Sequence, residues 1–378
     1  MNSMPRNRVL FALIIVAVAA GALGSFVADA PNRLVSGQPL GLWQAGGATT
    51  ALPLALLGAA LLVLSFARIT RATRLAGLGC SLAALLLWIF AAGSSASALM
   101  AAAPPATRIA LGWGFWATVF CLAMIVLDAL QRLDAHGLLR LSTVAAIVAA
   151  IAAMALAGHF DGLSLAREYA ARRSAFWSEL ERHCWLVLAA VAIALAIGAP
   201  LGVFVARRPS AGPGIFGALN LMQTIPSVAL FGLLIAPLSA LGVGGIGAAP
   251  AIIALVLYSL LPIVRNTHAG ITGVDPTVID AASGVGLTPT QILWRVELPL
   301  GLPVFLAGLR IVTVQAIGLT VIAALIGAGG LGSLVFQGIG QYALDLVLLG
   351  ALPTILLALA ADFALALIAA CFERNPAP

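Results

Sequence analysis

The sequence contains no lysine, because all nineteen of its basic residues are arginine. A phosphate-binding loop that ends in Gly-Lys-Ser or Gly-Lys-Thr is therefore absent. A catalytic lysine Schiff base is excluded for the same reason. If this protein depends on ATP, another chain must bind the nucleotide.

Charged residues of either sign are also scarce, at 8% of the chain, whereas 62% of the residues are hydrophobic. The mean hydropathy is +1.12. This composition predicts an all-α polytopic membrane protein. A net charge of +6 would suggest a nucleic-acid partner in a soluble protein. Here the arginines lie in short segments between apolar runs, where they set membrane topology, so we expect no nucleic-acid partner.

Cysteine and histidine give no sign of a metal or redox site. The chain has four of each, and their spacing matches neither zinc ligands nor a redox pair. We interpret the cysteines as small apolar side chains and the histidines as polar residues near the ends of spans. These residues are Cys80, Cys121, Cys184, Cys371, His136, His159, His183 and His268.

The first apolar run extends from Val9 to Val27 and is followed by Ala28-Asp29-Ala30, which could be a signal-peptide cleavage site. Nineteen apolar residues exceed a typical signal-peptide core, so we expect an uncleaved first span. Cleavage would leave the remaining topology unchanged. Nine further apolar segments, each close to the ~20 residues that cross a bilayer, bring the prediction to about ten. They are 49–66, 75–92, 109–128, 141–158, 184–205, 215–237, 249–264, 301–325 and 345–371.

The arginines predict the orientation of these spans. If both termini are cytoplasmic, more arginines fall on the cytoplasmic side than outside, as the positive-inside rule requires. The cytoplasmic set is Arg6, Arg8, Arg68, Arg71, Arg74, Arg132, Arg140, Arg207, Arg208, Arg265, Arg295 and Arg374. The outer set is Arg33, Arg108, Arg167, Arg172, Arg173 and Arg182.

A polar, amphipathic segment divides the chain. Residues 161–183 mix arginine and glutamate with Tyr169, Phe176 and Trp177, a pattern typical of a helix that lies on a membrane surface. We therefore expect an accessory bundle of about five spans over 1–160 and a functional core of five spans over 184–373.

The polar run from Asp280 to Pro299 lies between two core spans, on the predicted cytoplasmic side. Small residues suited to a short helix are followed by Gly284 and Gly286, and Thr288 with Pro289 can begin a second helix. Two short helices joined by a glycine turn would make a platform over 275–300 that another protein can bind.

This run resembles a motif of one transporter family. Asp280-Ala281-Ala282, three residues, Gly286, nine residues, and Val296-x-Leu298-Pro299 look like the EAA loop of ABC importer permeases. The family pattern is Glu-Ala-Ala, three residues, Gly, nine residues, Ile-x-Leu-Pro. Here aspartate replaces glutamate and valine replaces isoleucine.

Other core segments resemble the osmoprotectant branch of that family, whose substrates include glycine betaine, choline and proline betaine. They are Gln223–Leu230, Tyr258–Thr267, Gly308–Arg310 and Ala324–Gly332. The resemblance covers residues 180–371. The first five spans are not part of the common core, although some longer permeases of this branch carry such an extension.

The resemblance implies a type I importer core of five helices, in a multi-pass protein of the bacterial inner membrane. The implied partners are ABC ATPase subunits, a second permease subunit and a periplasmic or lipid-anchored substrate-binding protein. ATP would bind to the ATPase, so no cofactor and no catalytic residue is expected in this chain.

In that family the loop docks as a coupling helix on the ATPase. Ala281 and Ala282 would permit close approach, Gly286 a tight turn, and Pro299 would set the angle of the next span. Asp280 would cap the first helix.

Three alternatives remain open. A permease for another small polar solute, such as an amino acid, would share the loop. An ion-coupled secondary transporter would need intramembrane carboxylates, of which Asp362 alone lies well inside a core span. A membrane-embedded enzyme would need converging polar groups, and none converge.

Arg310 and Asp362 are the candidate buried charges. Each lies well inside a predicted span, where an ionisable residue is either paired or functional. We expect them either to form a structural ion pair or to act in the transport pathway. The substrate-binding residues cannot be assigned from the sequence, and Gly242-x-Gly244-x-x-Gly247 is interpreted as a tight loop rather than a nucleotide site.

Overall fold

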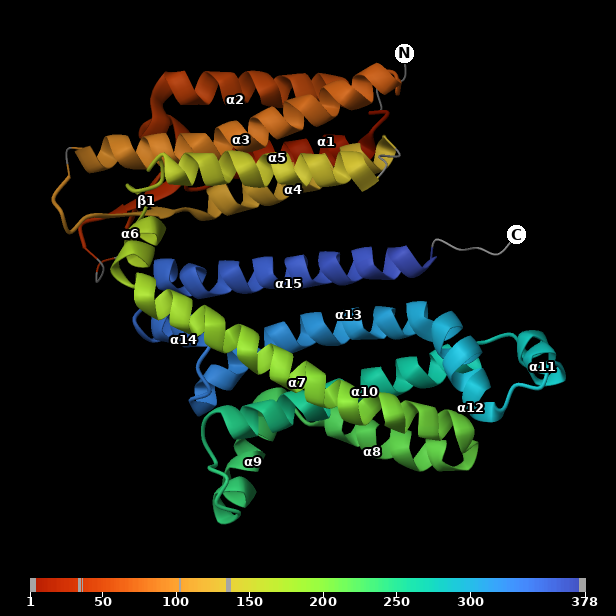
Figure 1. Ribbon diagram of the computed structural model, residues 1–378. Coiled ribbons are helices and arrows are strands. Elements are labelled where there is room, and N and C mark those ends of the chain that lie inside the picture. The colour runs from red at the N-terminus through yellow and green to blue at the C-terminus, as the bar shows by residue number, and fades with distance from the viewer. Residues whose placement is uncertain (1–4, 33–34, 36, 102, 134–136, 374–378) are drawn as a thin grey trace. The chain divides into compact units, whose positions relative to one another are not determined.

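The computed structural model describes residues 5–32, 35, 37–101, 103–133 and 137–373 (Figure 1). Arg33, His136 and Arg374, used above, lie outside these ranges, as do the extreme ends of both termini. The chain forms two compact units, Met1–Ala171 and Arg172–Pro378. The boundary between them falls inside the predicted 161–183 segment.

Unit 1 is a helical bundle with a small sheet at one end. Its core is aromatic: the Trp88 ring meets Phe26 edge-on at 4.8 Å between centroids and stacks with Phe115 at 6.5 Å. The indole N–H of Trp88 donates to the Phe115 carbonyl at 3.2 Å, so its polar atom is satisfied. The helices of this unit are α1 (Arg8–Leu23), α2 (Leu42–Phe66), α3 (Arg71–Ala101), α4 (Trp113–Arg132), α5 (Gly137–Leu156) and α6 (Ser164–Ala171).

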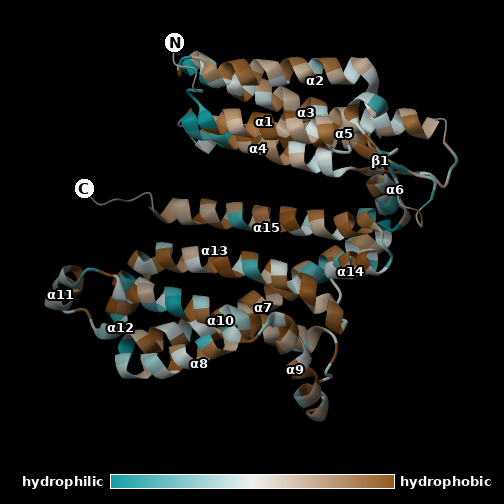
Figure 2. Cartoon of the chain, turned by 180° about the vertical axis from the view of Figure 1, so that it is seen from behind, coloured by the Kyte–Doolittle hydropathy of each residue, from teal (hydrophilic) through white to brown (hydrophobic). Residues whose placement is uncertain are grey.

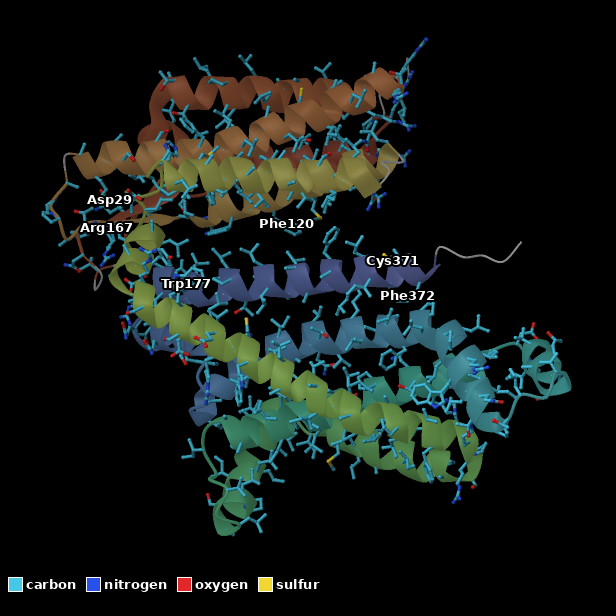
Figure 3. The ribbon with its side chains drawn as sticks, in the orientation of Figure 1. Asp29, Phe120, Arg167, Trp177, Cys371 and Phe372 are labelled. Carbon is cyan, nitrogen blue, oxygen red and sulfur yellow. The ribbon has the colours of Figure 1, made fainter. Side chains whose placement is uncertain are left out.

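The sheet is an addition to the predicted all-helical architecture. Strands β1 (Val27–Ala30), β2 (Gln38–Leu40) and β3 (Arg108–Leu111) pair antiparallel in the order β2-β1-β3. Arg167 of α6 donates to the carbonyls of Thr107 and Pro105 at 2.7 and 2.6 Å, and it lies at the same end of the unit as Asp29 (Figure 3). These bonds fix α6 to the chain that enters β3.

Unit 2 is built around α7, α10 and α13, which pack closely on one another. Small residues permit this approach: a Cβ on Gly202 of α7 would lie 2.5 Å from the Thr267 side chain of α10. The longer helices are α7 (Arg173–Arg207), α8 (Gly212–Thr224), α9 (Ser227–Ala240), α10 (Ala248–Thr272), α13 (Leu298–Ala323) and α15 (Leu344–Glu373). The shorter ones are the 3-10 turns Pro209–Ala211 and Ala324–Ile326, α11 (Pro276–Gly284), α12 (Pro289–Ile292), a π-turn over Leu293–Glu297, and α14 (Gly332–Gly340).

The predicted class, a polytopic helical membrane protein, is confirmed, and the count of ten spans is approximate. Each predicted segment overlaps a helix, and Figure 2 shows hydrophobic residues along most of their length. Among the described residues, eight helices are long and apolar enough to cross a bilayer, or nine if the pair α8–α9 forms one span.

Two predicted spans differ from simple crossing helices. Helix α1 has 16 residues, about 24 Å at ~1.5 Å per residue, which is short of the ~30 Å hydrocarbon layer. The helix ends at Leu23, and Val27, the predicted end of the span, is the first residue of β1. Helices α8 and α9 meet at a bend of 102°. The bend lies at Ile225-Pro226, because Ile225 is held extended by the proline that follows it.

The 161–183 segment is not a single helix. Helix α6 ends at Ala171, and α7 begins at Arg173 and runs 35 residues to Arg207. The polar residues from Arg173 to His183 are therefore the first turns of the same helix that continues as the first core span. No proline or glycine separates the polar part from the apolar part, which is consistent with one continuous helix.

Candidate functional site

The loop between α10 and α13 forms the predicted two-helix platform, but its first helix begins earlier than expected. Helix α11 starts at Pro276, and Asp275 is its N-cap, accepting hydrogen bonds at 2.8 Å from both the Thr277 N–H and the Thr277 hydroxyl. These bonds hold the pKa of the Asp275 carboxyl below its ordinary value. Asp280 lies inside the helix and is exposed, so the prediction that it caps the helix was wrong. Asp275 followed by a proline is the stronger start signal.

Helix α11 ends in a Schellman motif centred on Gly286. The Gly286 N–H donates to the Ser283 carbonyl at 2.9 Å, and the Leu287 N–H donates to the Ala282 carbonyl at 3.1 Å. Gly286 has φ +88°, and a Cβ there would meet no atom within 4 Å. Glycine is therefore required by the left-handed backbone and not by lack of space. Gly284 is the last helical residue.

The second helix begins with a capping box. The Thr288 hydroxyl accepts from the Gln291 N–H at 3.4 Å, and the Gln291 side chain accepts from the Thr288 N–H at 2.9 Å. Pro289 occupies the first turn, where its missing N–H costs nothing. The sequence predicted this start correctly.

A π-turn joins α12 to α13, so that the motif leads directly into the next span. The Leu298 N–H donates to the Leu293 carbonyl, five residues back. Pro299 follows at once, and its ring would clash with the Arg295 carbonyl in a regular α-helix. The widened turn accommodates that proline. Val296 and Leu298 are half-buried at this junction, and Pro299 is exposed.

The loop presents apolar side chains outward. Val285 is 80% exposed and Trp294 67%, whereas Ala282 is buried and Ala281 beside it is exposed. Figure 1 shows α11 and α12 projecting from the end of unit 2 at which α10 ends and α13 begins. Exposed apolar groups on a projecting, well-capped element are the kind of surface that protein partners often cover.

Glu297, inside the motif, was missed by the sequence reasoning. Its carboxylate is bound by the Arg207 guanidinium in a fork, with one bond of 3.0 Å from Nη1 to Oε1 and a second from Nη2 to Oε2. Glu297 is almost fully buried. The signal for it was present: Glu297 is the only carboxylate between Asp280 and Asp345, directly before an apolar span. The pair ties the end of α7 to the base of the platform.

Arg310 of α13 and Asp362 of α15 form a bidentate ion pair. Arg310 Nη2 donates to Asp362 Oδ2 at 2.5 Å, and Nε donates to Oδ1. Their side chains are 45% and 35% exposed, so neither is buried in this chain. No residue in the apolar 18-residue stretch of α15 is buried in this chain. The ion pair therefore lies on a surface that this chain does not cover.

At the other end of the core, the N-terminal part of α7 holds the glycine-rich loop before α14. The Glu179 carboxylate accepts from the Gly330 N–H at 2.6 Å, and Arg182 Nε donates to the Ala328 carbonyl at 3.0 Å. Gly330 has φ +88°, and a Cβ there would lie 3.2 Å from the fully buried ring of His183. The polar residues that suggested a surface helix thus partly serve to fix this loop.

Comparison with known proteins identifies both halves of the chain. Residues 198–373 match the model of the binding-protein-dependent transport system inner membrane component. Residues 6–166 match the N-terminal domain of the ABC transporter permease YehY. A solved inward-facing structure of the MetNI methionine ABC transporter has a similar fold, with a TM-score of 0.50 at 23% identity, over 53% of this chain and 98% of that one.

Curated relatives agree with this result. The osmoprotectant import permease protein OsmW of Salmonella typhimurium is 47% identical over 184 residues, which cover 49% of this chain and 85% of OsmW. The carnitine transport permease OpuCB of Listeria monocytogenes is 40% identical and covers 49% of this chain and 82% of its own. The choline transport permease OpuBB of Bacillus subtilis is 40% identical with the same coverage. With the platform and this degree of identity, the chain belongs to the permease family of binding-protein-dependent ABC importers.

Proposed function

We propose that this chain conducts osmoprotectants, small zwitterionic or cationic quaternary-ammonium solutes such as glycine betaine, into the cytoplasm. The single observation that carries the substrate class is the 47% identity to an osmoprotectant permease over 184 residues. Two other relatives are named for carnitine and choline transport, and both solutes contain the same trimethylammonium group as glycine betaine. An amino-acid solute is the alternative, which uptake of labelled glycine betaine against labelled methionine would separate.

The free energy for transport would come from ATP hydrolysis by partner chains. Permeases of this family are membrane subunits without an ATPase site, and their ATPase is a separate subunit. We assign ATP to that partner and no cofactor to this chain. The complex would contain two permease subunits, two ATPase subunits and an external substrate-binding protein, with both termini of this chain and the 275–300 loop on the cytoplasmic side.

The platform is the proposed docking surface for the ATPase. The side chains of Val285 and Trp294 are presented to solvent, and burying each fully would contribute roughly 1.5–3 kcal/mol. The exposed Asp280 and Ala281 would lie against the ATPase, whereas Ala282 is buried within the chain. Gly286 and Pro299 would orient the two helices. Movement of the ATPase subunits would then displace α11 and, through the continuous α12–α13 segment, the spans of unit 2.

Co-purification with the ATPase subunit tests this assignment. We expect Val285→Asp to lower the ATPase recovered with the permease about tenfold, since ~1.4 kcal/mol corresponds to that factor. Val243→Asp is the matched control: Val243 is 57% exposed and precedes α10, whereas the platform follows α10. Equal recovery from the two variants would contradict the docking surface. Absence of ATPase from the wild type after gentle extraction would contradict the importer assignment.

A further inference from the structure

Unit 1 contains a cavity of about 770 Å³ between α1 and α2, with α3 and α4 behind it. Two facing stripes of small residues border it. Ala17 and Gly21 lie on α1, and Ala51, Ala55 and Gly58 lie on α2. Stripes of this kind usually let two membrane helices approach closely. Here they border an open volume that falls within the size range of small-molecule sites.

The shape of α2 keeps this space open. Gly47 interrupts the helix with φ +64° and ψ −171°, and Pro53 follows six residues later. Together with the short α1, which gives way to β1, this leaves the sheet end of the two helices separated. A Cβ added to Gly58 would lie 3.6 Å from Val18, an ordinary contact, and the Asn7 N–H at the start of α1 donates to the Ser65 carbonyl of α2 at 3.0 Å, so the two helices meet at the end away from the sheet.

The lining contains no charged residue and no histidine. Three of its polar side chains are bonded: Thr118 donates to the Ala17 carbonyl at 3.2 Å, Trp88 donates to the Phe115 carbonyl, and Gln44 accepts from the Gly41 N–H at 3.0 Å. The Ser25 hydroxyl and the Trp43 indole are the other polar groups of the lining, so the cavity offers mainly apolar contact and no charged partner for a ligand. Water fills such a cavity poorly.

The opening runs along the helices. Val18 and Ala55, which both line the cavity, are exposed. Only 17% of the residues in the apolar 18-residue stretch of α2 are buried. Both helices carry apolar sequence of the kind that lies within the hydrocarbon layer. The side opening therefore gives onto lipid chains. Trp43 and Gln44 stand at the sheet end, where an amphipathic indole suits the polar boundary of a bilayer.

We propose that this cavity binds one acyl chain of a membrane phospholipid, with the head group at the level of Trp43 and Gln44. The chain fills the space between the small-residue stripes and packs α2 onto the rest of unit 1. A free fatty acid fits less well, because its carboxylate would enter a lining without any cation. A phospholipid keeps its phosphate outside the cavity, in the polar boundary.

Native mass spectrometry of the full-length protein tests the proposal. The protein would be extracted from vesicles of phosphatidylethanolamine and phosphatidylglycerol and washed in detergent until loosely held lipid is gone. We expect one phospholipid mass to persist on the wild-type chain. Ala55→Trp, which fills the cavity, should lower the lipid-bound fraction at least fivefold. Ala59→Trp is the matched control, because Ala59 is exposed on the same helix outside the lining.

A second measurement locates the lipid and does not require a variant. A trace phosphatidylcholine with a photoactivatable diazirine on its acyl chain should, after the same washing, label the α1 peptide that contains Gly21. In the mass spectra, three results would overturn the proposal: no retained phospholipid, a retained fatty acid in its place, or equal retention by the two tryptophan variants. In the labelling experiment, label found only outside α1 and α2 would overturn it. If Ala55→Trp fails to fold, Gly58→Leu replaces it.

Discussion

Arg207 and Glu297 form a fork-shaped ion pair in which the two partners differ in exposure: the Glu297 side chain is 3% exposed and the Arg207 side chain 42%. The cost of breaking the pair therefore depends on which partner is removed. A buried carboxylate without its cation has no access to water, whereas Arg207 can turn outward.

We accordingly expect Arg207→Met to destabilise unit 2 by about 3 kcal/mol and Glu297→Gln by less than about 1 kcal/mol. Thermal unfolding of the purified protein in detergent would measure both. Arg208→Met is the control, since Arg208 lies over the Phe204 ring at 5.6 Å and is exposed. A larger effect for Glu297→Gln than for Arg207→Met would show that the carboxylate is not held as described.

Substitutions at two neighbouring glycines should have opposite effects. Gly286→Ala places a Cβ at φ +88°, which costs roughly 1–2 kcal/mol, so we expect the platform turn to change and uptake to fall severalfold. Gly284→Ala lies at the end of α11 with open space around it and should be neutral or slightly stabilising. Uptake of labelled glycine betaine and ATPase co-purification would be measured for both. Similar losses from the two variants would refute the backbone argument.

The cap of α11 should depend on pH in one direction. The pKa of Asp275 is lowered from its ordinary 3.8 by its bonds to Thr277, so the unfolded helix binds the proton more readily than the folded one. The cap therefore stabilises α11 above that ordinary pKa and is lost as the pH falls through the lower, folded value. Hydrogen exchange of the α11 amides from pH 7 to pH 3 would follow this loss. In Asp275→Asn, which still caps, the same pH dependence should be absent.

The glycine-rich loop should loosen when its carboxylate anchor is removed. Glu179→Ala deletes the acceptor for the Gly330 N–H, a charge-assisted bond worth about 1.5–3 kcal/mol. We expect exchange of the Gly330 amide to become at least tenfold faster. Glu181→Ala provides the comparison, since Glu181 is exposed on the same helix. If both variants exchange alike, the anchor is not Glu179.

Neutralising both members of the Arg310–Asp362 pair should be tolerated better than neutralising one. Asp362→Leu leaves Arg310 without its partner in a span, so we expect a low yield of folded protein. Arg310→Leu combined with Asp362→Leu should restore the yield and keep betaine uptake. A well-folded double variant without uptake would instead give the pair a role in the transport pathway.

The linear sequence was sufficient for the class, the positions of the apolar helices and the family. Long apolar runs specify membrane helices because a spanning backbone must satisfy its own hydrogen bonds, a constraint that acts locally. Likewise, the start of α12 could be predicted from Thr288, Pro289 and Gln291, because a capping box involves residues only three apart. The EAA-like motif could be found from the sequence for a similar reason. Its glycine and its proline are required at their positions by the local backbone conformation alone.

What the sequence did not reveal depends on partners distant in the chain. Arg207 lies 90 residues from Glu297, and Glu179 lies 151 from Gly330, so neither contact leaves a periodic signature. The bend between α8 and α9, by contrast, has a local cause, the proline that follows Ile225. The cavity of unit 1 is the clearest case. Small residues on two helices predict close approach, and only the folded bundle, with α2 interrupted at Gly47, keeps them apart, because packing is a property of the assembled surfaces.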